Sequence, residues 1–183
     1  MVVSHDRDQR IRWALPLYHT LVGAVAEIEF ACDEWLWIPM HWAGKQVPCP
    51  GDDCPFCGVY SSRLRGFSLV RDEKRLFLLE LSAASEARLR GLLACSDLEF
   101  VAGLRCEVSR KHMRRPVVID PVSITAPARP VQFASEVLSN SVAVLLGWPT
   151  RLVSEPMESW ATRVESYAQR HAEVALRAIE AKA

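Results

Sequence analysis

One 18-residue segment, from His41 to Gly58, constrains the fold of this chain more than any other. It reads HWAGKQVPCPGDDCPFCG and contains three cysteines, three prolines, three glycines and one histidine. Proline and glycine disfavour helix interiors and central strands, and a loop so rich in both cannot build a hydrophobic core of its own. The segment therefore needs another source of stability, and its cysteines indicate which.

The three cysteines follow C-x4-C-x2-C spacing, and the histidine precedes the first of them by eight residues. A C-x2-C pair can direct two thiolates at one ion, with Gly58 able to take the positive φ that such a turn often requires. Structural zinc sites use four nitrogen or sulfur ligands in a tetrahedron and leave no open position for water. We therefore predict a structural zinc centre that folds the loop. Its four ligands would be His41, Cys49, Cys54 and Cys57.

Other interpretations of these residues stay open. His41 is predicted as the fourth ligand because it ends a predicted strand that leads into the loop. The alternatives to it are Asp52, Asp53 and Cys32. The C-x2-C pair is also compatible with a redox couple, although it lacks the following helix that lowers a thiol pKa in thioredoxin-like sites. Chance clustering is the third interpretation. Cys95 and Cys106 lie in apolar periodic segments, and we expect both to be buried as small hydrophobic residues.

The composition indicates a chain without strong charge. The 183 residues include 22 Lys and Arg and 22 Asp and Glu, so any basic patch must be local and balanced elsewhere. The charged N-terminus lacks the apolar region of a secretory signal, and no apolar run reaches the roughly 18 residues of a membrane helix. We expect a cytoplasmic protein with reduced thiols and no membrane contact. No nucleotide loop, nucleophile elbow or paired-carboxylate motif is present, so we expect no enzyme.

The hydrophobic periodicity divides the chain into a β-rich part and a helical part. Strands are predicted over 22–30, 34–42, 62–72, 75–82, 103–111 and 116–124. Helices are predicted over 82–94, 131–148 and 155–183. The predicted organisation is a leader over 1–21, a barrel over 22–125 with the zinc knuckle at 41–58, and a Pro-rich linker with two helices over 126–183.

The order of these elements favours an OB-fold. A small barrel with a helix between its third and fourth main strands is the arrangement of that fold. We therefore predict an α+β chain, mostly β, in which an OB-fold-like barrel carries an inserted zinc knuckle and is followed by C-terminal helices. The alternative is an unrelated α+β sheet with helices at one end.

Basic and aromatic side chains gather on two parts of the predicted barrel. One face of the strand over 62–72 carries arginines and a phenylalanine, and RKHMRR (110–115) forms a basic turn between the last two strands. Such residues provide the stacking and phosphate contacts of single-strand binding, and that turn is a usual ligand loop of an OB-fold. The candidate stacking residues are Trp35, Trp37 and Phe67. The candidate phosphate contacts are Arg63, Arg65, Arg71, Arg110, Lys111, Arg114 and Arg115. The alternative places the tryptophans in the core and makes the turn a solvated loop.

The plan of one His and three Cys inserted beside a basic and aromatic cleft resembles the single-stranded-DNA-binding core of T4-like phage helix-destabilising proteins. The order His41, Cys49, Cys54, Cys57 matches the ligand order of that family. The spacings between the first three ligands are shorter here, and this chain ends in a mixed-charge helix instead of an acidic tail. The resemblance covers at most 22–125 and implies a zinc-containing OB-fold, binding of single-stranded DNA and a phage or mobile-element context.

The predicted helix over 155–183 has an apolar stripe at i, i+3, i+4 spacing and is about seven turns long. It offers a surface for packing, self-association or a protein partner, and His171 in the stripe is expected to be an interface residue.

The sequence is compatible with two functions. The first is a non-enzymatic, zinc-stabilised protein that binds single-stranded nucleic acid, with DNA as the expected ligand. The alternative is a zinc-knuckle interaction subunit of a larger complex without nucleic-acid binding.

Overall fold

The structure is a computed structural model that describes residues 14–43, 46–51, 54–95, 100–110, 118–124, 131–151 and 155–181. Two compact units divide the chain. Unit 1 includes Ile38–Leu64 and Ser139–Ala183, and unit 2 consists of Leu15–Trp37 and Arg65–Leu138. The predicted barrel segment, 22–125, therefore contributes residues to both units.

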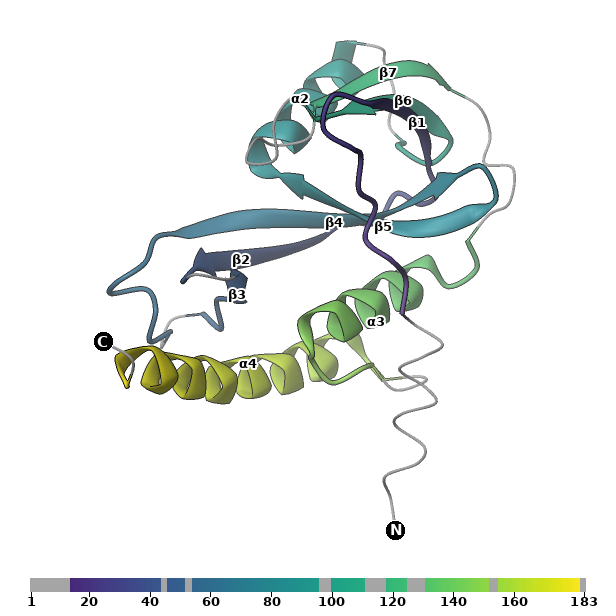
Figure 1. The fold of residues 1–183 in the computed structure, drawn as a ribbon. Helices are drawn as coiled ribbons and strands as arrows, with labels where there is room; N and C mark the ends of the chain where they lie inside the picture. The colour runs from purple at the N-terminus through teal and green to yellow at the C-terminus, as the bar shows by residue number, and fades with distance from the viewer. Residues whose placement is uncertain are drawn as a thin grey trace. The chain divides into compact units, whose positions relative to one another are not determined.

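The chain alternates strands and helices in the order shown in Figure 1. The elements are β1 (Val25–Phe30), β2 (Leu36–Trp42), β3 (Gln46–Pro48), β4 (Ser62–Asp72), β5 (Arg75–Ser82), α2 (Ala83–Cys95), β6 (Leu104–Ser109), β7 (Val118–Ile124), α3 (Ala134–Leu146) and α4 (Met157–Glu180). All six predicted strands and all three predicted helices are present. The three-residue strand β3 was not predicted from the sequence.

The strands are neighbours in the order β3-β2-β4-β1-β6-β7, and β5 pairs with β4. The pairings whose register is described are antiparallel, for example Asp72 with Arg75 across the β4–β5 turn and Ile28 with Cys106 between β1 and β6. Within the described ranges no ladder joins the two ends of this order, so the sheet is open. The chain is thus α+β with an antiparallel sheet, and the closed barrel is not formed by these pairings.

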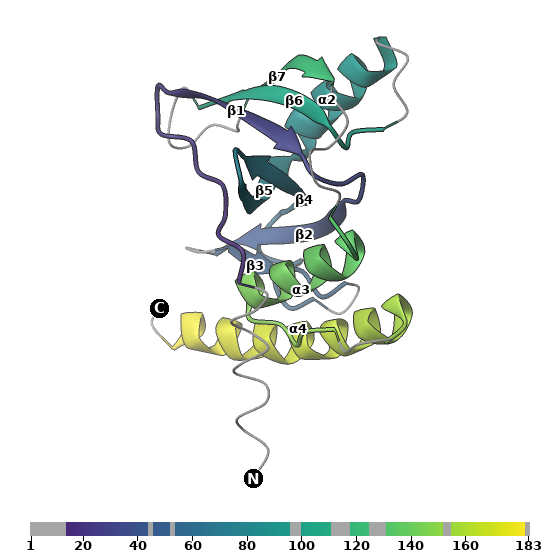
Figure 2. The same cartoon turned by 90° about the vertical axis from the view of Figure 1, so that its right-hand side faces the viewer.

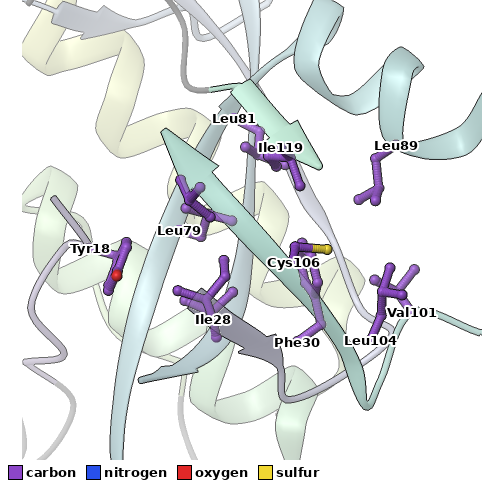
Figure 3. Close-up of a cluster of buried hydrophobic side chains, with 12 residues drawn as sticks. Tyr18, Ile28, Phe30, Leu79, Leu81, Leu89, Val101, Leu104, Cys106 and Ile119 are labelled. Atoms are coloured by element: carbon purple, nitrogen blue, oxygen red, sulfur yellow. The ribbon is translucent and has the colours of Figure 1, made fainter. Parts of the chain in front are cut away.

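The core of unit 2 forms between strands and helix α2 (Figure 3). Strand β6 alternates as predicted, with Leu104, Cys106 and Val108 buried and the residues between them exposed. Cys106 has the predicted role of a small buried hydrophobe. The core cluster comprises Tyr18, Ile28, Phe30, Val70, Leu79, Leu81, Leu89, Val101, Leu104, Cys106, Val108 and Ile119.

Helix α2 begins where its sequence predicts. The backbone N–H of Ser85 donates to the Ser82 hydroxyl at 3.2 Å, which satisfies one of the free donors of the first turn. Glu86 follows in that turn, where a negative charge is favourable. Leu89 then packs into the core cluster.

Helix α4 and the part of α3 from Ser139 onward belong to unit 1, and β3 contacts α4 (Figure 2). In α4 the buried residues are Trp160, Val164, Ala168 and Ala172. The predicted stripe is buried or half-buried from Trp160 to Ala168, whereas Met157 at its start is exposed. It then continues through Ala172, whereas His171 and Val174 are exposed. No helix within the described ranges has the length and apolar character needed to cross a bilayer.

Candidate metal centre

Two short backbone segments bring the predicted ligands together. The hairpin of β2 and β3 pairs His41 with Val47, and the chain leaving β3 returns along β2, with the N–H of Cys49 donating to the carbonyl of Pro39 at 2.8 Å. The turn before β4 then supplies Cys54 and Cys57. All of these residues belong to unit 1.

The four ligand atoms form one compact cluster. The Sγ atom of Cys54 lies 3.3 Å from Nε2 of His41, and the Sγ atom of Cys57 lies 3.7 Å from the same nitrogen. The sulfurs of Cys49 and Cys57 are 3.6 Å apart. All four atoms lie within 4.8 Å of one another, so a single metal ion can contact all of them.

The imidazole of His41 is held in position by the backbone. Its Nδ1 is 2.9 Å from the carbonyl oxygen of Tyr60, and a carbonyl can only accept a hydrogen bond, so the proton must lie on Nδ1. Nε2 is then the unprotonated nitrogen, and it faces the sulfurs. This pairing of a ligating histidine with a backbone carbonyl is a common way to fix the tautomer at metal sites. The side chain is only 1% exposed.

The turn that carries the last two cysteines is built from local hydrogen bonds. The N–H of Cys57 donates to the carbonyl of Cys54 at 3.1 Å, and the N–H of Tyr60 donates to Phe56 at 2.8 Å. The expectation of a positive φ at Gly58 is wrong. That conformation occurs at Gly51, with φ of 110°, which a side chain would strain.

The thiols differ in their surroundings. Cys54 is buried, Cys49 is half-buried and Cys57 is exposed. Burial raises the pKa of the Cys54 thiol to about 12, and the hydrogen bond with Cys49 raises the pKa of the Cys57 thiol. A metal ion must therefore displace protons from these thiols when it binds.

The cluster is also part of a small hydrophobic core. Val47, Cys54, Phe56 and Ala172 are buried together, and Ala175 and Leu176 pack against them. Helix α4 thus rests on the knuckle, so whatever orders the knuckle also orders the surface on which the helix packs.

Of the alternative candidates for the fourth ligand, one lies away from the cluster and two are not described by the structure. Cys32 is buried in unit 2, where its sulfur lies 3.7 Å from the Ser68 hydroxyl and 3.6 Å from the carbonyl of Glu34. It is not part of the cluster. Asp52 and Asp53 lie outside the described residues. His41 is the fourth member of the cluster, as the sequence predicted.

The predicted stacking residues lie in unit 2. Trp35 and Trp37 stack on each other, with ring centroids 5.9 Å apart and planes inclined by 13°. Both are half-buried, and Trp35 packs against the core cluster. Phe67 is only 1% exposed, so its ring belongs to the interior.

The predicted phosphate-contacting residues are in varied surroundings. Arg63 is exposed. The side chain of Arg65 forms an ion pair with Glu80 at 3.5 Å, and that of Arg71 forms one with Glu29 at 3.5 Å. Arg110 is half-buried, and its carbonyl accepts a hydrogen bond from the N–H of Gly23. The remaining three, Lys111, Arg114 and Arg115, lie outside the described residues.

The stacked tryptophans and the arginines of β4 lie on different faces. A Cβ atom on Gly66 would come within 2.5 Å of the Trp37 ring, so Trp37 covers the face of β4 to which Gly66 points. Side chains alternate along a strand, so Arg65 and Phe67 point to the opposite face. The structure therefore does not bring the Trp37 ring to the face of β4 that carries Arg65, and Phe67, which shares that face, is buried.

One exposed aromatic residue was missed in the sequence. Trp42 ends β2 and is 66% exposed. Trp42 belongs to unit 1, as does the exposed Arg63 of β4. Its position as the last residue of β2 was the available signal, because strand ends are less covered than strand centres.

Comparisons with protein-family models, with curated proteins and with solved structures find no match to this chain.

Proposed function

We propose that this chain is a non-enzymatic, cytoplasmic protein that binds single-stranded nucleic acid, with DNA as the expected ligand, and that a structural zinc ion orders its binding surface on β2 and β4. The observation that carries the proposal is the cluster of four ligand atoms in unit 1, which also contains an exposed tryptophan, Trp42, and an exposed arginine, Arg63.

The ligand set favours zinc over other ions. In a zinc tetrahedron with Zn–S of about 2.3 Å and Zn–N of about 2.0 Å, sulfurs lie about 3.8 Å apart and sulfur lies about 3.5 Å from nitrogen. The distances of 3.6 Å between sulfurs, and of 3.3 and 3.7 Å from sulfur to Nε2, are close to these values. One imidazole and three thiolates suit this soft, tetrahedral coordination. With four protein ligands no position remains for a reactive water, so the ion is structural.

The strand pairings support an OB-type barrel. The pairings join β1 with β4, β4 with β5, β1 with β6 and β6 with β7. Helix α2 lies between β5 and β6 in the chain. This is the Greek-key order of an OB-fold with one seam unpaired, and OB-folds are partly open barrels. Residues of β5 and β7 share the core cluster. In this scheme the knuckle lies in the loop between the first two barrel strands, which is a usual ligand loop.

Trp42 and Arg63 form the proposed contact surface for the ligand. An exposed indole stacks on any base, and a neighbouring guanidinium contacts the phosphate. The second contact is the loop between β6 and β7, whose hairpin closes at the pair of Ser109 and Val118. That loop carries the candidate residues Arg110, Lys111, Arg114 and Arg115. Arg65 and Arg71 contribute less, because Glu80 and Glu29 neutralise them.

Fluorescence anisotropy of labelled oligo-dT with the zinc-loaded chain tests this function. We expect binding at low salt and a rise in Kd of about tenfold between 50 and 200 mM salt, because phosphate contacts release counterions. The substitution Trp42→Ala should raise Kd about 5- to 150-fold, the equivalent of about 1–3 kcal/mol for one stacked base. Val174→Ala, at an exposed position of α4, is the control and should leave Kd unchanged. No binding at low salt would overturn the proposal.

The alternative function is a protein-interaction subunit. Val59 and Leu64 are exposed apolar residues of unit 1, and their exposure favours a protein contact. In that case Leu64→Ser would weaken the association with a protein partner, and oligo-dT would not bind at any salt concentration.

A further inference from the structure

The exposed side of the metal centre carries two neighbouring thiols. The Sγ atoms of Cys49 and Cys57 are 3.6 Å apart. Cys57 is exposed and Cys49 is half-buried, whereas Cys54 is buried against Phe56 and Ala172. A soluble oxidant can therefore reach one side of the cluster and not the other.

We propose that Cys49 and Cys57 form a peroxide-reactive pair whose oxidation to a disulfide releases the metal and frees helix α4 from the knuckle. This inference rests on the proposed zinc centre and adds a site of oxidative modification to it. It requires a sulfur displacement of only part of the 3.6 Å separation, because a disulfide needs its sulfurs about 2.05 Å apart. Cys57 lies in a turn, and Cys49 follows the end of β3.

The reaction balances with a hydroperoxide as oxidant. The Cys57 thiolate attacks one oxygen of hydrogen peroxide, the O–O bond breaks, and a sulfenic acid and hydroxide form. The Cys49 thiolate then attacks the sulfenic sulfur, the S–O bond breaks, and the S–S bond forms with loss of a second hydroxide. Two solvent protons convert the hydroxides to water. In sum, two thiolates, one peroxide and two protons give one disulfide and two waters.

Metal loss follows from the number of ligands left. After the reaction only His41 and Cys54 can hold the ion, whereas a structural zinc site needs four ligands. The same knuckle supports the α4 residues Ala172, Ala175 and Leu176. Loss of the ion therefore weakens the packing of α4 on the knuckle.

The test uses the full zinc-loaded chain and hydrogen peroxide, with released zinc measured by a chromophoric chelator. Differential alkylation and mass spectrometry then identify the oxidised residues. We expect one zinc released per disulfide, a Cys49–Cys57 linkage, Cys54 recovered as a free thiol, and faster proteolysis within α4. A dithiol reductant with added zinc should restore the original state. Cys32→Ser, which removes a thiol outside the cluster, should release zinc at the same rate as the wild type.

Zinc retained under excess peroxide would overturn the inference, and so would zinc loss with a linkage through Cys54 or with sulfinic acid in place of a disulfide. Mapping the oxidised wild type needs no variant, so a poorly folding Cys57→Ser chain does not affect the result. Oligo-dT binding by the reduced chain is measured separately. Binding without peroxide-driven zinc release would contradict only the inference, and a chain purified without metal would contradict the zinc centre itself.

Discussion

Gly66 shows at the scale of one residue how a missing side chain creates a contact. The Trp37 ring occupies the space that a Cβ would take, with its nearest carbon 2.5 Å from the ideal Cβ position. A glycine in a strand often marks a place where another group approaches closely. The sequence shows the glycine within its strand, but the identity of the ring over it depends on the pairing of β2 and β4.

The substitution Gly66→Ala is expected to destabilise the protein by about 1–3 kcal/mol, because the tryptophan ring must move. Urea unfolding measures this free energy. Gly91→Ala is the matched control, since that site in α2 has open space around it, and alanine there should add about 0.5–1 kcal/mol. Equal effects of the two substitutions would contradict the described contact.

The thiols of the metal centre predict a pH dependence. The pKa of the Cys54 thiol is raised to about 12, and that of Cys57 is also raised, so both are protonated at neutral pH without an ion. Metal binding must release these protons, and the apparent affinity should rise with pH by about tenfold per unit for each proton displaced. Chelator competition between pH 6 and 8 measures it. An affinity independent of pH would show that the thiols are not the ligands.

Helix α4 is the element that links the knuckle to the rest of unit 1. Its start is fixed by polar contacts, since the indole N–H of Trp160 donates to the carbonyl of Pro149 at 2.9 Å and Arg163 forms an ion pair with Glu155 at 2.7 Å. Its end packs on the knuckle through Ala172. The small size of Ala172 lets the helix approach the turn that carries Cys54 and Phe56.

The substitution Ala172→Asp places a charge among buried apolar side chains and should cost about 3–5 kcal/mol, since Ala172 is 0% exposed. We expect weaker metal retention against a chelator as well. Val174→Asp introduces the same side chain at a position that is 66% exposed and should change neither quantity. Thermal unfolding followed at two chelator concentrations compares the two variants, and equal metal loss would argue against the packing of α4 on the knuckle.

At the scale of the whole molecule, patterns local in sequence were predictable, whereas the burial of side chains that distant segments cover was not. The cysteine spacing gave the metal cluster, and the alternation of Leu104, Cys106 and Val108 gave β6 and its buried face. β3 was missed because three residues beside prolines carry almost no periodic signal. Phe67 was predicted on an exposed face and Trp42 was missed for a common reason. β4 is covered on both faces at its centre, whereas β2 ends uncovered, and both facts depend on distant segments.

Unit 1 should depend on the ion far more than unit 2, because the core cluster of unit 2 contains none of the metal ligands. Hydrogen exchange after chelation should show lost protection in β3 and α4 and retained protection in β6. Uniform loss in both units would mean that the ion stabilises the whole chain.

The central claim is that a structural zinc orders the knuckle, and elemental analysis of protein purified without added metal tests it most directly. The account predicts about one zinc per chain, with loss of folded unit 1 in chelator. Less than about half an equivalent of zinc, with α4 and the knuckle still folded in chelator, would contradict it.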